Sequence, residues 1–559
     1  MTEKNRRSSR AFGQAPVLGS IRARRLRILL LAVLCSAFVL FLIPYHSDRF
    51  NLLRNKFEKQ PAIQIQCRFG KEDSATEAIR VQRQQKVKEA FVHAWEGYKK
   101  HAWLKDELKP ISGGFEDPFI GWAATLVNSL DALYILGLQE EFHHALHALG
   151  SVDFSRPNAE KVPVSETAIK YLGGLLGAYD ISGGEHLILL QKARQLGDFL
   201  LLAFDTLNGV PVPYYFWEKS GEQLHGEIGV QIAQIGSLSL EFTRLSQLTG
   251  ERKYFDAVSR ITVYMERAQN STLIPGLWPT TVDTRGPSFK GTTFTLGTLE
   301  DSVYEYLPKE HILLNGETTQ YLKMYRKALA SATKYHFFVP KVPGNWSLLF
   351  PGYLGAYGAE PTLHAEVQHR SCFVGGMVAL GSRINDSPLE LATAAKLTDG
   401  CVWAYQNTAS GIMPETFQVD ECSKNSIAGA CDWKNATATE PGHQYGFTSI
   451  SDKSYMLRPE AIESVFVMYR ITGDPAWQEK GWTMFQAIMN HTTTPIANAW
   501  IEDVTSENTT QGDGMESYWL AQTLKYFYLL FSEPDLVSLD DFVLNAEAHP
   551  FRLRDRLFT

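Results

Sequence analysis

The sequence repeats one local pattern, an apolar helical segment that ends at a glycine. Five segments show this pattern, and they end at Gly137, Gly183, Gly250, Gly316 and Gly473. Glycine most readily takes the left-handed conformation that closes a helix, so each glycine marks a helix C-terminus. The first three spacings are 46, 67 and 66 residues, which leaves room for a helix pair and a loop in each. Because helix pairs need neighbours to bury their apolar faces, the repeat predicts an all-α fold built of helical hairpins.

Helical hairpins can stack as an open solenoid or close into an α/α barrel. The loops of this chain are uneven in length, and long irregular stretches fall near residues 341–365 and 419–452. Uneven, decorated loops favour the closed form over a regular stack. We therefore expect a closed α/α barrel over residues 86–559.

A basic block and an uncharged apolar segment begin the chain. Residues 1–27 carry eight Lys and Arg side chains against Glu3 alone, and residues 28–45 (ILLLAVLCSAFVLFLIPY) carry no charge. Eighteen residues of helix span about 27 Å, close to the thickness of a bilayer core. We interpret 28–45 as a single-pass transmembrane anchor with a cytosolic tail at 1–27. A cleaved signal peptide is the alternative, although its apolar core would be shorter.

Features after the apolar segment agree with a luminal address. Residues 46–85 are polar and weakly patterned, as in a stem between membrane and barrel. Four of the six cysteines are grouped between residues 372 and 431, where two disulfides would suit an oxidising compartment and buried free thiols are the alternative. Asn-x-Ser/Thr sequons occur at Asn270, Asn345, Asn385, Asn435, Asn490 and Asn508.

Carboxylate or amide side chains stand near the start of the first helix of each pair. They are Asp117, Glu166, Gln234, Asp301, Glu460 and Glu516. Each one alone is explained as a helix cap, because acidic side chains favour the exposed N–H groups of a first turn. In a closed ring, however, the same end of every inner helix faces one mouth. A carboxylate cluster there indicates a glycosidase or a metal site.

Composition and motifs narrow the chemistry. A formal charge of -7 and a pI of about 6.1 argue against nucleic-acid binding, because phosphate binding needs a clustered basic surface. The sequence contains no H-E-x-x-H, P-loop or G-x-S-x-G motif, which argues against zinc, phosphoryl-transfer and acyl-transfer chemistry. Carbohydrate hydrolysis remains, with aromatic side chains available to stack on sugar rings; ordinary core packing is the alternative for most of those aromatics.

Ordered motifs from about residue 87 to 552 resemble class I α-1,2-mannosidases of glycoside hydrolase family 47. They include "GWAATLVNSLDALYILGL", "ETAIKYLGGLLGAY", "DSVYEYL", "LRPEAIESVFVMYRITGD" and "NAEAHPF". The chain is similar to the type II membrane members that trim N-glycans in the endoplasmic reticulum or Golgi. The resemblance implies an (α/α)7 barrel plugged by a C-terminal hairpin, and a disulfide between Cys372 and Cys401.

The resemblance also implies an activity and a set of site residues. The expected reaction is inverting hydrolysis of terminal α-1,2-linked mannose on high-mannose N-glycans, in which one carboxyl group is the acid and another activates water. Glu460 matches the base, and Glu166 and Asp301 match the candidates for the acid. The implied substrate-binding residues are Arg458, Glu463, His369, Tyr518, Glu547 and Lys170.

The chain departs from the family at its calcium site. The resemblance implies one Ca2+, bound by a threonine hydroxyl and carbonyl, by waters held on carboxylates, and by two hydroxyls of the sugar. Ala546 stands at the threonine position and keeps only the backbone carbonyl. Gln234 and Gln522 replace glutamates, and Lys170 replaces an arginine. Because three of these changes remove negative charge or a hard oxygen ligand, we expect weakened calcium binding.

These departures leave a second functional hypothesis open. The barrel could be a catalytically impaired, mannose-glycan-binding relative of a lectin-like or quality-control kind. Retention of Glu166, Asp301 and Glu460 favours the enzyme, and it disfavours a purely structural stem protein. The resemblance places the barrel in the Golgi or endoplasmic-reticulum lumen, and Leu299 matches the Golgi members that remove several mannoses.

Overall fold

The computed structural model describes residues 63–553 apart from positions 220, 222, 299, 345 and 423–445. The chain divides into two units, Met1–Ala62 and Ile63–Thr559, and all described residues belong to the second. The predicted tail and anchor, the first part of the predicted stem, Leu299 and Cys431 lie outside the described residues. Within the described part of the chain, no helix is long and apolar enough to cross a membrane.

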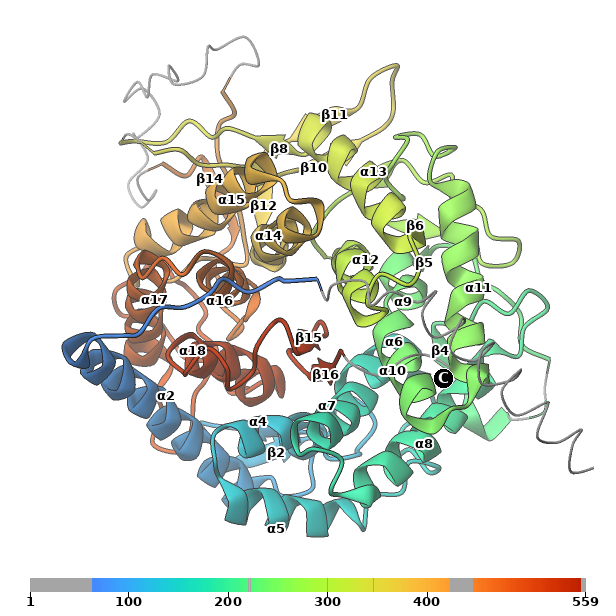
Figure 1. Cartoon of the computed structure of the whole chain (residues 1–559), viewed down its shortest axis with the longest axis horizontal. Helices are drawn as coiled ribbons and strands as arrows, with labels where there is room; N and C mark the ends of the chain where they lie inside the picture. The colour runs from blue at the N-terminus through green and yellow to red at the C-terminus, as the bar shows by residue number, and fades with distance from the viewer. Residues whose placement is uncertain are drawn as a thin grey trace, which may run out of the picture. The chain divides into compact units, whose positions relative to one another are not determined.

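Long helices of the second unit are arranged in two concentric layers (Figure 1). Each inner helix packs against an outer helix, and seven such pairs can be traced through the described residues. The pairs, inner helix first, are α4 (Leu130–Ile135) with α5 (Gln139–Leu149), α7 (Gly173–Ile181) with α8 (Leu187–Leu201), α10 (Ser239–Thr249) with α11 (Arg252–Ala268), α12 (Asp301–Leu313) with α13 (Gln320–Tyr335), α14 (Val374–Asn385) with α15 (Pro388–Gln406), α16 (Glu460–Thr472) with α17 (Ala476–Thr492), and α18 (Leu524–Leu530) with α2 (Ser74–His101).

Contacts between the inner helices close the ring. Each inner helix from α4 to α18 packs against the next one in this order. The π-helical turn η6 (Trp519–Thr523), which leads into α18, contacts α4 and joins the last pair to the first. The closed α/α barrel is therefore confirmed, and the open solenoid is excluded for this part of the chain.

Sequence patterns account for the two layers. The inner helix α16 is buried along nearly its whole length, because it has neighbours on every side. The outer helix α11 buries one face only, with Tyr254, Val258, Ile261 and Met265 at helical spacing. All five glycines predicted to end helices have positive φ values, between 67° and 72°. Gly250 and Gly473 close α10 and α16 in this way.

The ordered body begins before residue 86, inside the segment predicted as stem. Helix α2 starts at Ser74, and the Asp73 side chain accepts hydrogen bonds from the first backbone N–H groups of that helix. Upstream of it, the backbone N–H of Ile65 donates to Asp540 Oδ1 at 2.6 Å. The first turns of α2 are polar and mostly exposed, so they carry little of the apolar periodicity on which the prediction relied.

Shorter elements connect the helix pairs. The helical ones are α3 (Ala124–Asn128), α6 (Val164–Thr167), α9 (Ile232–Gly236), the π-helical η1 (Ala168–Leu172), and the 3-10 turns η2 (Leu202–Phe204), η3 (Trp217–Lys219) and η4 (His369–Phe373). The strands before the C-terminal hairpin are β1 (Glu107–Lys109), β2 (Gly114–Glu116), β3 (Val162–Pro163), β4 (Tyr214–Tyr215), β5 (Val230–Gln231), β6 (Thr281–Val282), β7 (Thr293–Phe294), β8 (Phe337–Phe338), β9 (Phe350–Pro351), β10 (Tyr353–Gly355), β11 (Thr362–His364), β12 (Glu366–Gln368), β13 (Thr416–Gln418) and β14 (Ser449–Asp452).

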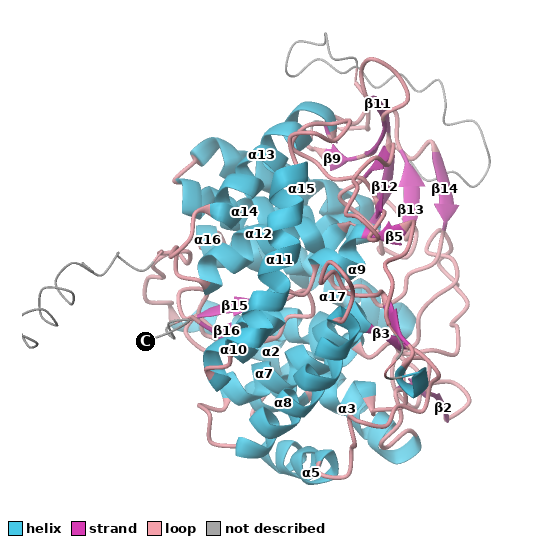
Figure 2. Cartoon of the chain, turned by 90° about the vertical axis from the view of Figure 1, so that its right-hand side faces the viewer, coloured by secondary structure: helices cyan, strands magenta, loops and turns pink. Residues whose placement is uncertain are grey.

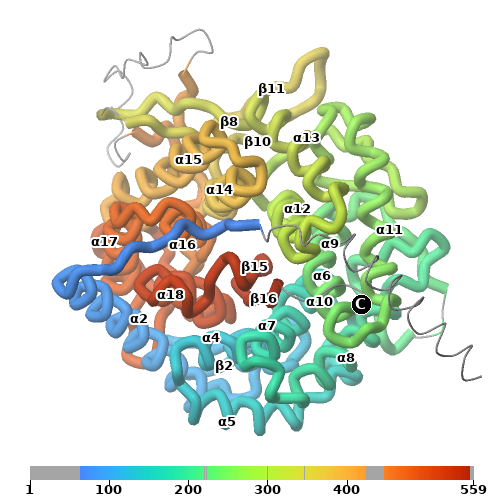
Figure 3. Tube along the Cα trace, viewed as in Figure 1, coloured from blue at the N-terminus to red at the C-terminus, as the bar shows by residue number. Residues whose placement is uncertain are grey.

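Most of these strands gather on one side of the helical layers (Figure 2). The antiparallel hairpin of β15 (Phe542–Leu544) and β16 (Pro550–Arg552) lies apart from them and inside the ring (Figures 2 and 3). It packs against the inner helices α7 and α12. The connection between its strands, residues 545–549, is thereby held in the barrel interior, as expected for a plugging hairpin.

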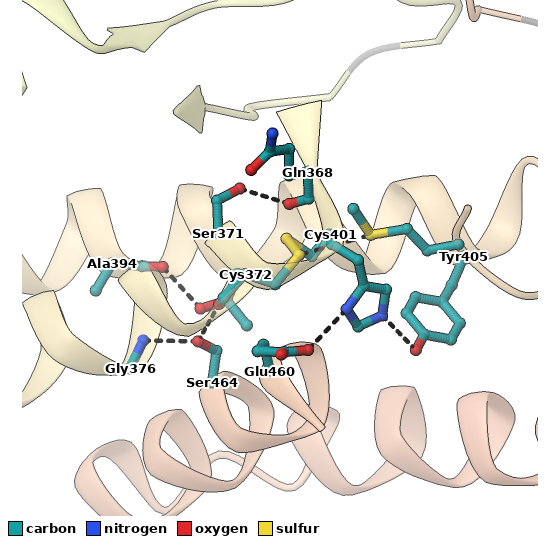
Figure 4. The surroundings of a disulfide bond; sticks show 12 residues. Gln368, Ser371, Cys372, Gly376, Ala394, Cys401, Tyr405, Glu460 and Ser464 are labelled. Carbon is teal, nitrogen blue, oxygen red and sulfur yellow. Dashed lines mark hydrogen bonds and ion pairs between the residues drawn. A yellow bond between two sulfur atoms is a disulfide. The ribbon is translucent and has the colours of Figure 1, made fainter. Parts of the chain in front are cut away.

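A disulfide links η4 to α15. Cys372 and Cys401 are bonded at an S–S distance of 2.03 Å, which confirms the predicted pair. Figure 4 shows this bond close to Tyr405 and Glu460. Cys67 is a half-buried free thiol. Cys422 is also disulfide-bonded, as a second disulfide within the cysteine group requires. The partner of Cys422 is not among the described residues, and Cys431 lies outside them.

Candidate active site

One cavity gathers the side chains from the starts of the inner helices. Its volume is about 510 Å³, within the usual range for a small-ligand pocket. Five of the six carboxylate or amide residues noted in the sequence line it, whereas Asp117 instead bonds Lys105 and the backbone of Asp106. The lining includes Glu166, Lys170, Gln234, Asp301, Arg458, Glu460, Glu463, Glu516, Tyr518, Gln522, Ala546 and Glu547.

Glu460 is held as an ionised carboxylate. It is the first residue of α16, and His369 Nδ1 lies 3.0 Å from its Oε2. Burial by itself would raise the pKa of Glu460. The hydrogen bond from His369 and the charges of Arg458 and Arg370 outweigh burial and lower that pKa to about 2. A carboxylate that stays ionised is suited to accept a proton from water.

His369 supports Glu460 from behind. Its side chain is fully buried in η4, and its Nε2 lies 2.9 Å from the hydroxyl of Tyr405 on α15. The adjacent disulfide fixes η4 against α15, so the ring that orients Glu460 is anchored on two elements. His369 does not line the cavity and acts through Glu460.

Asp301 has the opposite electrostatic character. It is the first residue of α12, and its Oδ1 accepts the backbone N–H of Ser302 at 2.9 Å. Burial raises the pKa of Asp301, and the positive charge of Arg370 opposes that rise without cancelling it. Glu460 and Asp301 therefore differ in the direction of their pKa shifts, as the base and the acid of one reaction do.

Lysines pair with the deeper carboxylates. Lys170, on the π-helical η1, places its Nζ 2.7 Å from Oε1 of Glu547, and both side chains are largely buried. Lys309 Nζ lies 3.1 Å from Glu463 Oε1 and also contacts Glu305. The predicted site residues Lys170, Glu463 and Glu547 all line the cavity.

Arg458 and Tyr518 form another side of the cavity. Arg458 Nε lies 2.9 Å from Glu415 Oε2, and its guanidinium is 5.6 Å from the centroid of the Tyr518 ring. The Tyr518 hydroxyl donates to the carbonyl of Met456 at 2.6 Å. Leu457, directly before Arg458, takes a left-handed conformation with φ of 61°, which turns the chain just ahead of Arg458 and Glu460.

Several cavity residues were missed from the sequence. Glu305 lines the cavity, and burial raises its pKa to about 8. Its place four residues after Asp301 on one helix was the available signal. Arg370 also lines the cavity, with its Nη1 4.0 Å from Asp301 Oδ2. It follows His369 directly, whereas Phe119 and Tyr214 carried no distinguishing signal.

The chemistry of the donor set does not fit a calcium ion at Ala546. The Ala546 carbonyl oxygen already accepts a hydrogen bond from Gln522 Nε2 at 2.8 Å. Both oxygens of Glu547 accept bonds from nitrogen, from Lys170 and from Asn128 Nδ2 at 2.7 Å each. Calcium takes six to eight oxygen ligands, whereas the Ala546 carbonyl and both Glu547 oxygens already bond N–H donors here.

Comparison with known proteins identifies the family. The model of "Glycosyl hydrolase family 47" matches residues 90–553. The chain belongs to glycosyl hydrolase family 47. This assignment agrees with the carboxylate-lined cavity inside an α/α barrel and makes the chain a glycoside hydrolase.

Named members of family 47 are similar over most of the chain. A mannosyl-oligosaccharide 1,2-alpha-mannosidase of Arabidopsis thaliana is 34% identical, over 86% of this chain and 80% of the relative. The human mannosyl-oligosaccharide 1,2-alpha-mannosidase IC is 33% identical, over 91% of this chain and 76% of the relative. The solved structure of an alpha-1,2-mannosidase from Trichoderma reesei matches with a TM-score of 0.77 and 31% identity, over 85% of this chain and 99% of that one.

Proposed function

We propose that this family 47 member removes terminal α-1,2-linked mannose from high-mannose N-glycans by inverting hydrolysis. The observation that carries the proposal is the pairing, in one cavity, of an ionised Glu460 with an Asp301 whose pKa is raised. An inverting enzyme needs such a pair, one group to take a proton and one to give it. The similarity to named 1,2-alpha-mannosidases supplies the substrate class.

Each residue has a proposed role in this reaction. Glu460 takes a proton from the attacking water, while His369 and Arg458 keep it ionised. Asp301 protonates the departing glycosidic oxygen, because its raised pKa favours the protonated form. Glu166 faces the same cavity and is the alternative acid. The ring of Tyr518 and the guanidinium of Arg458 offer a stacking surface and a hydrogen-bond donor to the sugar.

We further propose that the barrel works in the lumen of the Golgi or endoplasmic reticulum as a single-pass type II membrane protein. The apolar segment at 28–45 and the basic residues before it support this topology. The sequon residues Asn270, Asn490 and Asn508 are exposed, so they are open to glycosylation. The Cys372–Cys401 disulfide is also typical of an oxidising compartment.

The decisive experiment compares two substrates on three variants. The full-length chain, Glu460→Gln, Asp301→Asn and Glu166→Gln are each incubated with a high-mannose N-glycan and with α-mannosyl fluoride. Fluoride departs without protonation, so the variant that lacks the acid keeps its activity on the fluoride and loses it on the glycan. The variant that lacks the base loses both.

The outcomes separate the competing functions and roles. Loss of hexoses from the glycan with wild-type protein supports the enzyme. Rescue of Asp301→Asn by the fluoride assigns the acid to Asp301, whereas rescue of Glu166→Gln alone assigns it to Glu166. Unchanged glycan mass together with measurable glycan affinity would instead support the mannose-binding relative.

A further inference from the structure

The floor of the cavity, formed by Lys170, Gln522, Ala546 and Glu547, contains a hydrogen bond at the position where the family resemblance implies a calcium ligand. Gln522 Nε2 donates to the carbonyl of Ala546 at 2.8 Å, and the Gln522 side chain is nearly fully buried. We propose that this enzyme binds mannose without a cation, and that Gln522 and Lys170 supply the sugar-binding hydrogen bonds in its place. This inference rests on the proposed function and concerns how the same site holds its substrate.

The hydrogen bond at Ala546 disfavours a cation on that carbonyl. The amide N–H of Gln522 points its partial positive charge at the carbonyl oxygen and uses one of its two lone pairs. Alanine has no hydroxyl to offer as a second ligand. A divalent ion would therefore find a single lone pair of this residue and a positive dipole beside it, where a calcium site offers several hard oxygens.

The surrounding acidic side chains already bond nitrogen donors. Glu547 accepts from Lys170 through one oxygen and from Asn128 through the other. Lys309 contacts both Glu463 and Glu305. Two buried lysines thus already pair with these three carboxylates. A doubly charged ion among them would have to displace these contacts and would be repelled by both ammonium groups.

Gln234 completes the neutral environment. Its Oε1 accepts the backbone N–H of Gln231 at 3.3 Å, as the capping side chain of helix α9. Its carboxamide oxygen therefore serves the helix start. An amide at this position contributes no charge to a cation.

The two proposed donors, Lys170 and Gln522, both lie on π-helical backbone. Lys170 lies on the π-helical η1 and Gln522 on the π-helical η6. Single π-helical turns within helices are commonly found at functional sites, because they redirect side chains that a regular helix would align otherwise. Both side chains line the cavity. Gln522 Nε2 carries a second hydrogen, and the Lys170 ammonium carries three, so both can donate to sugar hydroxyls.

The test measures calcium and substrate separately on the full-length chain. Calcium binding is followed with CaCl2 by titration calorimetry and by the change in Tm, and kcat/KM on α-1,2-mannobiose is measured with CaCl2 and with chelator. We expect no heat of binding, no change in Tm, and kcat/KM values that agree within about twofold. Gln522→Ala removes the donor and lowers kcat/KM about tenfold in both solutions.

Reversion variants test whether these residues exclude the ion. The double variant Gln522→Glu with Ala546→Thr restores a carboxylate and a hydroxyl. We expect this variant to bind calcium and to have a higher Tm with CaCl2. We also expect its kcat/KM to fall at least tenfold with chelator. Gln234→Glu is the matched control, with the same chemical change at the helix cap, and we expect it to acquire no calcium binding.

Each result decides one statement. Calcium binding or chelator sensitivity of the wild-type chain overturns the inference, and so does a folded double variant that gains no calcium binding. A wild-type chain that cleaves nothing in either solution contradicts the proposed function, while its heat and Tm with CaCl2 still decide the metal question.

Discussion

Two parts of the cavity differ in what they retain. The catalytic wall, formed by Asp301, Glu460 and Arg458 with His369 behind Glu460, keeps every residue that the family resemblance implies. The floor, formed by Lys170, Gln522, Ala546 and Glu547, is substituted at three of its four positions. In the wall a carboxylate is kept ionised by a histidine and an arginine, whereas in the floor amide and ammonium groups bond the oxygens.

In the proposed reaction the wall transfers the protons, and the floor helps to hold the sugar. Both parts are built on strained backbone, since Leu457 in the wall and Ala548 beside the floor have φ of 61° and 60°. Such positions cost about 1–3 kcal/mol each and persist at functional sites. The strained positions lie beside both the wall and the floor, as is common for residues that border a functional site.

The largest expected effect is at the wall. Glu460→Gln keeps the shape of the side chain but removes the base, so we expect kcat/KM to fall about 1000-fold. The measurement is mannose release together with Tm, which should not fall by more than a few degrees. Glutamine has nearly the same shape as glutamate, so we expect the packing of α16 to stay intact.

Glu310→Gln is the matched control for that prediction. Glu310 is buried on α12 outside the cavity, and burial raises its pKa to about 8, so it is mostly neutral at pH 7. We expect this variant to keep its activity. If Glu460→Gln keeps its activity and Glu310→Gln loses it, the assignment of Glu460 as the base is wrong.

The next largest effect is a change in the free energy of unfolding, caused by a substitution in the floor. Lys170→Met leaves Glu547 buried without its ammonium partner, and breaking a buried ion pair from one side costs about 3 kcal/mol. Lys170→Arg keeps the charge and should cost much less. Denaturant unfolding measures both. Equal stability of the two variants would show that the floor does not depend on its ion pair.

Much of the fold could be predicted from the sequence, because the ends and starts of its helices are determined by nearby residues. The glycines at 250 and 473 and the acids at the starts of the inner helices follow from backbone conformation and helix electrostatics. A closed ring brings the same end of every inner helix to one mouth. The meeting of Glu166, Asp301 and Glu460 in one cavity could therefore be predicted without knowledge of contacts between distant residues. The start of the body was predicted too late, because the first turns of α2 are polar.

The parts that the sequence did not predict are contacts between distant segments. The bond from Gln522 to Ala546 joins residues 24 positions apart, and the one from Lys170 to Glu547 joins residues 377 positions apart. Their consequence for calcium depends on which atom donates, and residue types alone do not give that. Arg370 was missed for the same reason, since only the folded η4 brings it beside Asp301.

A smaller effect tests how the wall holds its charge. His369→Ala removes the hydrogen bond that lowers the pKa of Glu460, so that pKa rises. A base must be deprotonated, and activity is lost as the pH falls through its pKa. The acid limb of the kcat/KM profile should therefore move to higher pH by about one unit. Tyr405→Phe leaves the Nδ1 bond in place and should leave that limb unmoved.

The smallest effect concerns the acid and separates the two candidates for it. Arg370 lies 4.0 Å from Asp301 with a side chain 40% exposed, so water screens its influence. Arg370→Leu removes a charge that lowers the pKa of Asp301, and that pKa rises. An acid must be protonated, so the alkaline limb of kcat/KM should move up by about half a pH unit, while Arg370→Lys leaves it in place. If the alkaline limb of kcat/KM does not move in Arg370→Leu, the proton comes from Glu166, and Asp301 is not the acid.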